Sequence, residues 1–324
     1  MILYIRGVIS AMFLNGLIFE FILKTFLNEK NIKHINTLNL NTMKAIAVSI
    51  VISILLMTQA HGQGMYFRLG GGYALPLASE VIGTKDVRTR PATGNQIYTS
   101  ENVSGSFGAG MNINLGGGYM FNENIGFDLG VLYQRSKKYE TIDNYYDPFG
   151  KEEDIITHQS TAIFFNPSFL ITSGTGTKVP YGKFGVVVGS PKIKVEENYF
   201  YNLDGTETQH REWEYRKGMA FGFQGTVGMN WMLSNKLDLF TEINFVSMSF
   251  YPGEYELTIY TSNGTNVLPN LPVNSKKVEF VKQLDPNAPF VATSPRQELQ
   301  EAKSFGALSF NVGIRFLMKG HIVD

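Results

Sequence analysis

The sequence predicts an all-β fold, an eight-stranded antiparallel up-and-down β-barrel that spans a membrane. Three observations predict it. Long segments alternate strictly between apolar residues and small or polar residues, which is the period of a β-strand with two different faces. The connections between these segments alternate between short and long. No apolar run after residue 62 reaches the roughly 20 residues of a membrane-spanning helix.

The clearest alternation predicts a hairpin over residues 106–134, with a polar turn at 122–124. Its apolar positions are Phe107, Met111, Ile113, Leu115, Tyr119 and Phe121 before the turn and Ile125, Phe127, Leu129, Val131 and Tyr133 after it. Small or polar residues, above all glycine, lie between them. The first strand, 106–121, is much longer than the usual strand of roughly 5–6 residues. A lipid-facing apolar side opposite a small, polar lumen side explains both the length and the glycines.

Six further segments show the same alternation: 64–77, 160–173, 181–195, 217–233, 237–250 and 303–318. Long polar connections alternate with short ones along the chain. The long ones are 78–105, 136–159, 196–216 and 251–302, and the short ones are 122–124, 174–179 and 234–236. A membrane barrel that starts at the periplasmic side requires this order, with short periplasmic turns and long extracellular loops. A soluble β-sandwich offers no reason for it. Ten strands stay open as an alternative if the last long connection contributes a membrane hairpin.

The segment before the barrel predicts export. Residues 43–62 combine Lys44, an apolar run and the small-residue pattern Ala60-His61-Gly62, which predicts a signal peptide cleaved after Gly62. Residues 1–42 are interpreted as an upstream extension from a start codon called too early, with Met43 as the real start. A first transmembrane helix is the alternative for this extension. The barrel domain is expected over residues 63–324.

Composition excludes several function classes. The chain has no cysteine, which excludes a disulfide framework and zinc–cysteine sites. A formal net charge of zero provides no basic stripe for nucleic acid. His210 and His321 stand alone in the sequence, and scattered histidines do not make a metal site. We therefore expect neither a metal nor a cofactor.

Aromatic residues gather near the inferred periplasmic ends of the strands, where an interfacial girdle is expected. The predicted girdle consists of Phe67, Tyr119, Phe121, Tyr181, Trp231 and Phe316.

With its alternation, its loop asymmetry and a final strand carrying Phe310, Val312, Ile314 and Phe316, the chain resembles the small outer-membrane β-barrel family typified by the OmpA transmembrane domain and OmpX. The resemblance covers residues 64–318, and the Asn- and Lys-rich composition suits a Bacteroidetes-like member. It implies a place in the outer membrane of a Gram-negative bacterium and contact with outer-membrane lipid. It also implies recognition of the last strand by the barrel-assembly machinery.

Six charged residues fall on the predicted lumen side: Arg68, Asp128, Lys183, Asp238, Glu242 and Arg315. An eight-stranded barrel is just wide enough for side chains to fill, and an unpaired buried ion costs several kcal/mol. We therefore expect a packed plug of paired charges. Arg68 and Arg315 should lie on adjacent strands, with Asp128 and Glu242 as their counter-charges. A narrow or gated passage for small solutes is the alternative.

The predicted function is that of a non-enzymatic, monomeric protein with a structural or surface-interaction role, whose long loops meet an extracellular ligand or host surface. The third and fourth loops contain strand-like extensions with exposed aromatics, and loops on rigid scaffolds carry function. Transport of small or hydrophobic solutes is the second hypothesis. A lipid-modifying enzyme is the third, because His158 and Ser160 share a face at the outer end of a strand; a solvated loop junction explains the same pair.

Overall fold

A computed structural model describes residues 64–77, 79–203, 205–285 and 291–318. The predicted upstream extension, 1–42, and signal peptide, 43–62, lie outside these residues. No helix among the described residues is long and apolar enough to span a membrane.

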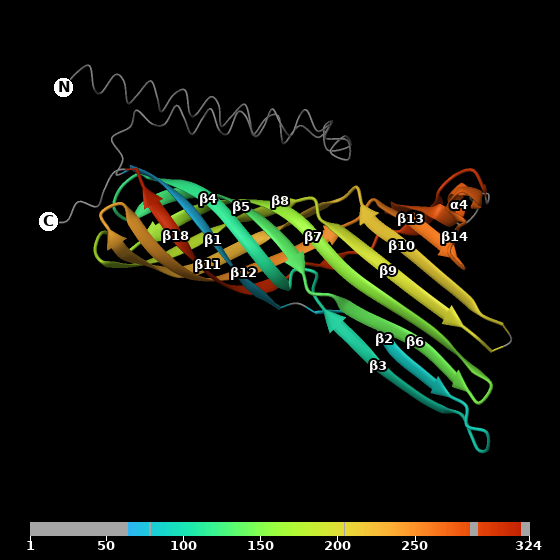
Figure 1. Ribbon diagram of the computed structural model, residues 1–324. Coiled ribbons are helices and arrows are strands. Elements are labelled where there is room, and N and C mark those ends of the chain that lie inside the picture. The colour runs from blue at the N-terminus through green and yellow to red at the C-terminus, as the bar shows by residue number, and fades with distance from the viewer. Residues whose placement is uncertain (1–63, 78, 204, 286–290, 319–324) are drawn as a thin grey trace, which may run out of the picture. The chain divides into compact units, whose positions relative to one another are not determined.

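Eight long antiparallel strands close into a barrel, as the sequence predicts (Figure 1). They are β1 (Gly64–Pro76), β4 (Gly110–Met120), β5 (Ile125–Ser136), β7 (Gly150–Thr172), β8 (Lys178–Gly189), β11 (Met219–Ser234), β12 (Leu237–Tyr251) and β18 (Ala307–Leu317). Each strand pairs with the next in this order, and β18 pairs with β1 to close the barrel. After Tyr251, which ends β12, the described residues of the segment up to 302 add no strand to the barrel, so the strand number is eight.

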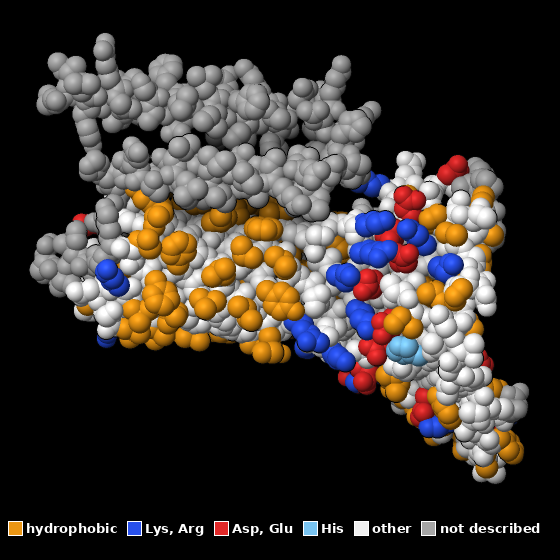
Figure 2. Space-filling model, turned by 45° about the horizontal axis from the view of Figure 1, so that its top comes forward, with side chains coloured by type: hydrophobic (Ala, Val, Ile, Leu, Met, Phe, Trp, Pro, Cys, Tyr) orange, Lys and Arg blue, Asp and Glu red, His pale blue; other side chains and the backbone are white. Residues whose placement is uncertain are grey.

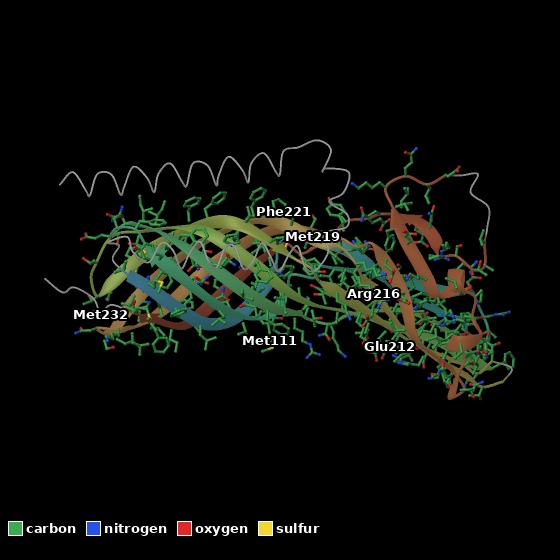
Figure 3. The ribbon with its side chains drawn as sticks, turned by 90° about the horizontal axis from the view of Figure 1, so that it is seen from above. Met111, Glu212, Arg216, Met219, Phe221 and Met232 are labelled. Atoms are coloured by element: carbon green, nitrogen blue, oxygen red, sulfur yellow. The ribbon has the colours of Figure 1, made fainter. Side chains whose placement is uncertain are left out.

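The barrel exterior is apolar because one parity of each strand faces outward. Met111, for example, is 70% exposed, whereas its neighbour Asn112 is buried. Figure 2 shows the hydrophobic side chains as a broad band across the visible face of the barrel. On β11 the band runs from the exposed Leu233 beside the short turn to Phe221 and Met219, which Figure 3 labels toward the other end of the strand. Lipid contact thus accounts for the alternation that the sequence shows.

Beyond the barrel, the four long connections form a second, extracellular sheet that continues from the barrel strands (Figure 1). Its order is β3-β2-β6-β7-β9-β10-β13-β15-β16, and β7 runs through both parts, because its first half pairs with β6 and β9 and its second half with β5 and β8. The added elements are β2 (Glu80–Thr89), β3 (Ile97–Gly105), β6 (Tyr139–Asp147), β9 (Lys192–Tyr201), β10 (Glu207–Arg216), β13 (Glu254–Ser262), β14 (Thr265–Asn266), η3 (Leu268–Asn270), α4 (Val273–Lys276), β15 (Lys277–Val281), β16 (Arg296–Leu299) and β17 (Lys303–Ser304).

The strand extensions predicted for the third and fourth loops are present, but the first two loops were expected to be polar connections only. They contain β2, β3, β6 and the outer half of β7. Much of this sheet contacts water on both faces, and β3 is exposed along most of its length. Such strands lack the apolar side that makes a period of two visible.

Phe107 is a second correction, because the sequence places it on the lipid face of its strand. The chain instead turns at 106–109, where the Ala109 amide donates to the Ser106 carbonyl over 3.0 Å. It enters β4 only at Gly110, whose φ of 148° suits glycine. Phe107 is buried against the rings of Phe305 and Tyr139. The alternation before Gly110 therefore does not belong to the barrel strand.

Candidate functional site

The lumen is filled by three layers of side chains, and the layer nearest the short turns is ionic. Arg68 on β1 is its centre: Nη2 donates to Asp128 Oδ1 over 2.7 Å, and Nη1 donates to the Glu242 carboxylate over 3.4 Å. Asp128 lies on β5 and Glu242 on β12, so the guanidinium connects strands from different sides of the barrel. All three residues are buried.

Glu242 accepts further hydrogen bonds from Lys183 Nζ over 2.8 Å and from Tyr181 Oη over 2.9 Å. Tyr66 Oη donates to the other oxygen of Asp128, Oδ2, over 2.7 Å. Each carboxylate thus has a cation and a phenol as donors. A buried ion is tolerated when such partners replace its water shell.

Arg315 forms a separate pair within the same layer. Its Nε donates to Asp238 Oδ2 over 2.9 Å, and its Nη2 donates to the same oxygen. The sequence correctly places Arg68 opposite Arg315 on neighbouring strands, but it names Asp128 and Glu242 as the counter-charges for both. Arg315 pairs with Asp238 because these two residues face each other in the β12–β18 register.

The six predicted lumen charges are therefore all inside, as three cations and three carboxylates that are neutral in sum. Four of them are linked to one another (Arg68, Asp128, Lys183 and Glu242), and Arg315 and Asp238 form the separate pair. Arg68 and Arg315 carry like charges and stand opposite each other on neighbouring strands. Their repulsion is offset because each guanidinium forms an ion pair with its own carboxylate. Aromatic faces add to it: the Arg315 guanidinium lies 5.3 Å from the centre of the Tyr66 ring, and that of Arg68 lies 6.0 Å from the centre of the Phe240 ring.

The middle layer is polar and uncharged. Its buried amides are Asn112, Asn114, Asn166, Gln224, Asn244 and Asn311. Within it, Asn166 Nδ2 donates to Gln224 Oε1 over 3.2 Å, and Gln224 Nε2 donates to Ser168 Oγ over 2.6 Å. Two lumen cavities have volumes of about 20 and 10 Å³, which is room for about one water molecule each.

The layer nearest the extracellular sheet is apolar, whereas the sequence predicts a polar plug throughout. Phe305, from the segment before β18, contacts three other rings with centroid separations of 6.0 Å, those of Phe107, Phe164 and Phe250. Val187, Ile193 and Met248 are buried in the same cluster. The sequence prediction missed this layer because Phe107 and Phe305 belong to connections outside the barrel strands.

Tyr181 is a correction to the predicted aromatic girdle. It is only 8% exposed and points into the lumen, where it donates to Glu242. Its strand position lies near the periplasmic end, but its parity is that of Lys183, two residues later, which faces inward. Tyr66 was also missed as a network residue, although it stands two residues before Arg68. Each phenol stands two residues before a lumen-facing charge and therefore on the same face of its strand. This spacing is the signal that identifies both phenols.

The other five girdle residues lie on the outside of the barrel or at its edge. Phe67, Phe121 and Phe316 are exposed, and Tyr119 and Trp231 are half-buried. The rings of Tyr119 and Phe121 meet edge to face at 5.6 Å.

His158 and Ser160, the candidate catalytic pair, lie just above the apolar layer. Ser160 is buried, and its hydroxyl donates to the Phe107 carbonyl over 2.8 Å. Burial, with Lys303 nearby, lowers the pKa of His158 to about 4. His158 stands opposite the buried Val195 and Tyr139, so the pair faces the interior and not the lipid surface.

His210 has neighbours that the sequence could not show. Cross-strand pairing of β9 and β10 brings it beside Glu196 and Glu212, with their ligand atoms within 4.8 Å of one another. Lys194 Nζ lies 2.8 Å from Glu212 and 3.8 Å from Glu196. The Lys194 ammonium group thus already balances one of the two negative charges at this cluster. His321 lies outside the described residues.

Two solved structures are similar to this chain. Neisserial surface protein A is 11% identical, with 79% of this chain and 97% of that one covered and a TM-score of 0.29. The outer membrane protein OprG from Pseudomonas aeruginosa is 10% identical, with 81% and 99% covered and a TM-score of 0.37. A search of curated protein sequences gives no match.

Residues 45–267, more than half of the chain, match the outer membrane protein β-barrel domain family. The match agrees with the closed eight-stranded barrel and its apolar band, and it confirms the predicted place in the outer membrane of a Gram-negative bacterium. The chain belongs to the outer membrane protein β-barrel domain family.

Proposed function

We propose that the protein is a non-enzymatic outer-membrane barrel that conducts no solutes and holds a rigid extracellular sheet for surface interactions. The observation that carries the proposal is the filled lumen. A solute path would have to cross the apolar layer around Phe305, the amide layer and the ion pairs of Arg68 in turn. Each of these layers is held by contacts between strands on different sides of the barrel.

The extracellular sheet supports the second half of the proposal. The rings form a continuous stack in the order Trp213, Tyr255, Tyr215 and Phe280, with successive centroids 4.7, 4.2 and 5.9 Å apart. The stack joins β10, β13 and β15. A surface stiffened in this way needs little ordering when it binds a partner, which lowers the entropic cost of association. Such rigidity favours a recognition surface over a merely solvated rim.

Recording in planar lipid bilayers tests the sealed lumen. The purified, folded protein should show no defined single-channel steps. A variant with Phe164→Ala and Phe305→Ala, checked for folding by its altered electrophoretic mobility before heating, should show increased leak, because both rings belong to the outer seal. Regular steps from the wild-type protein would contradict the proposal and favour the transport hypothesis.

Trimming one hairpin tests the surface role. Glu80 and Gly105 face each other at the base of the β2–β3 hairpin, so a short Asn-Gly turn between them should leave the barrel intact. Cells that make the trimmed protein should aggregate and attach less than cells with the full chain. A matched variant shortened only at the β13–β14 turn provides the control. Equal attachment of all three would contradict a binding role for this part of the sheet.

The lipid-modifying hypothesis has little support from the site. A hydrolase needs its nucleophile beside a base and open to substrate, but the Ser160 hydroxyl is engaged with a backbone carbonyl inside the rim. We also propose that the protein is a monomer and that the assembly machinery binds β18. The closed pairing of all eight barrel strands leaves no edge in the membrane for a second copy.

A further inference from the structure

A group of exposed cations marks the outer end of β5. Arg135, Lys137 and Lys138 are all exposed, and among the residues that the structure describes they form no ion pair. Cations farther out on the extracellular sheet are often matched, as Arg88 is by Asp143 at 2.6 Å and Arg211 by Glu197 at 2.7 Å. Lys137 Nζ lies 4.7 Å from the centre of the Tyr139 ring, but none of the three cations has a carboxylate partner among the described residues. A group of positive charges without counter-ions therefore stands apart from the balanced charges around it.

These cations lie at the edge of the lipid-facing band. Two residues before Arg135, the outward Tyr133 pairs with Ile163 on β7, and these side chains are 44% and 52% exposed. On its other side Arg135 pairs with Met111, which is 70% exposed and thus more exposed than Tyr133 and Ile163. Figure 2 shows Lys and Arg side chains gathered directly beyond the hydrophobic band. The position is the level at which the headgroups of the outer leaflet begin.

Lys192 extends the group across the next strand. Thr161 on β7 pairs with Arg135 on one side and with Lys192 on the other, so the two cations flank a small hydroxyl side chain. Lys192 Nζ also lies 3.1 Å from Glu214 Oε2, but Lys192 remains exposed. Lys192 therefore adds an exposed positive charge to the group even though it also has a carboxylate partner.

Arg135 is held in position for a ligand. Its Nη2 donates to Gln159 Oε1 over 3.2 Å, and Gln159 Nε2 donates to the Ser136 carbonyl over 2.9 Å. The remaining N–H groups of the guanidinium have no partner among the described residues. A planar guanidinium with four free N–H donors matches the oxygens of a phosphate group.

We propose that Arg135, Lys137, Lys138 and Lys192 bind the phosphate of a lipid headgroup in the outer leaflet. The acyl chains of this lipid lie against Met111, Tyr133 and Ile163. Continuity with the lipid-facing band selects a lipid over a free phosphate ion, because the same surface that carries the cations contacts hydrocarbon two residues away. Binding of this kind fixes the height of the barrel in the membrane.

Native mass spectrometry of the folded full-length protein in a neutral detergent tests the site. The probes are dioleoyl phosphatidic acid, dioleoyl phosphatidylcholine and inorganic phosphate. Wild-type protein should retain phosphatidic acid over phosphatidylcholine, and the preference should decline as salt is raised. In the variant R135Q/K137Q/K192Q the preference for phosphatidic acid over phosphatidylcholine should fall by a factor of at least about ten, because each surface cation near anionic lipid contributes about 1 kcal/mol.

The matched control is K85Q/R90Q/K282Q, which removes three exposed cations from the extracellular sheet. It should keep the full lipid preference. Equal losses in the two variants would overturn the proposal, because they would show a response to net charge alone. Competition by inorganic phosphate at the lipid's own concentration would also overturn it, because the site would then recognise a free ion. Both variants must retain the mobility shift of a folded barrel on heating; if R135Q/K137Q/K192Q does not, the single change R135Q replaces it.

Discussion

The ionic layer predicts a large penalty for neutralising one carboxylate. Glu242 accepts from Arg68, Lys183 and Tyr181. The change Glu242→Gln keeps the size of the side chain but removes its charge. Arg68 retains Asp128 as a partner, whereas Lys183 has Glu242 as its only ion-pair partner among the described residues. The variant therefore leaves one buried ammonium group unpaired.

The magnitude follows from the burial of this pair. The side chains of Lys183 and Glu242 are 3% and 4% exposed, and removing one partner of such a pair costs about 3–5 kcal/mol. Exchanging both members, in Glu242→Gln with Lys183→Met, removes the charge together with its counter-charge. This double variant should be more stable than Glu242→Gln alone by about 2 kcal/mol or more.

Urea unfolding of the refolded protein in lipid vesicles, followed by fluorescence of Trp213 and Trp231, measures these free energies. The matched control is Asp143→Asn, which breaks the exposed pair with Arg88. An exposed pair contributes about 0–1 kcal/mol, so the control should hardly move the transition. If Glu242→Gln costs no more than Asp143→Asn, Lys183 and Glu242 do not form a tightly paired, buried ion pair.

Three further predictions test other parts of the structure. Tyr181→Phe should lower the free energy of unfolding by about 1–2 kcal/mol, because Glu242 loses a hydrogen bond; no change would mean that Tyr181 faces the membrane interface after all. Phe305→Ala should cost about 3–5 kcal/mol in the same urea titration, because the ring fills the outer seal; a loss below 1 kcal/mol would contradict that packing. Burial raises the pKa of Glu254, but hydrogen bonds from Lys217, Lys277 and Arg216 outweigh it and lower this pKa to about 2. A carboxyl with a lowered pKa stabilises the fold above its unfolded pKa of about 4.5 and loses this effect as pH falls toward 2. The hydrogen-exchange protection factors of β10 and β13, corrected for the intrinsic exchange rate at each pH, should therefore decrease over that interval in the wild type and change less in Glu254→Gln.

The barrel could be predicted from the sequence because lipid contact imposes one parity on every membrane strand. Arg68 and Asp128 could be placed inside on this ground alone. Their pairing across the lumen could not be assigned uniquely, because it depends on how far each strand is shifted along its neighbours. The pairing of Arg315 with Asp238 shows the difference, since a candidate set chosen by charge alone included the wrong carboxylates.

The errors at Tyr181 and Phe107 have a common physical cause. Each assignment used one property, depth along the strand for Tyr181 and alternation for Phe107, without the backbone geometry that turns a side chain inward or outward. The extracellular strands were missed for another reason. A strand with water on both faces, such as β3, has no apolar side, so its sequence does not differ from that of a polar loop.

The glycines of the barrel strands connect the sequence pattern with the sealed lumen. A methyl group added at Gly118 would overlap the Tyr66 ring, and one added at Gly116 would lie 2.9 Å from Nε of Arg68. These large side chains can extend into an eight-stranded barrel only because the strand beside them carries none. Gly228 makes the same room for Tyr181. The glycines on the lumen face are therefore complementary to the network: they leave the space that the phenols and the guanidinium fill, and an open channel would have no need of that match.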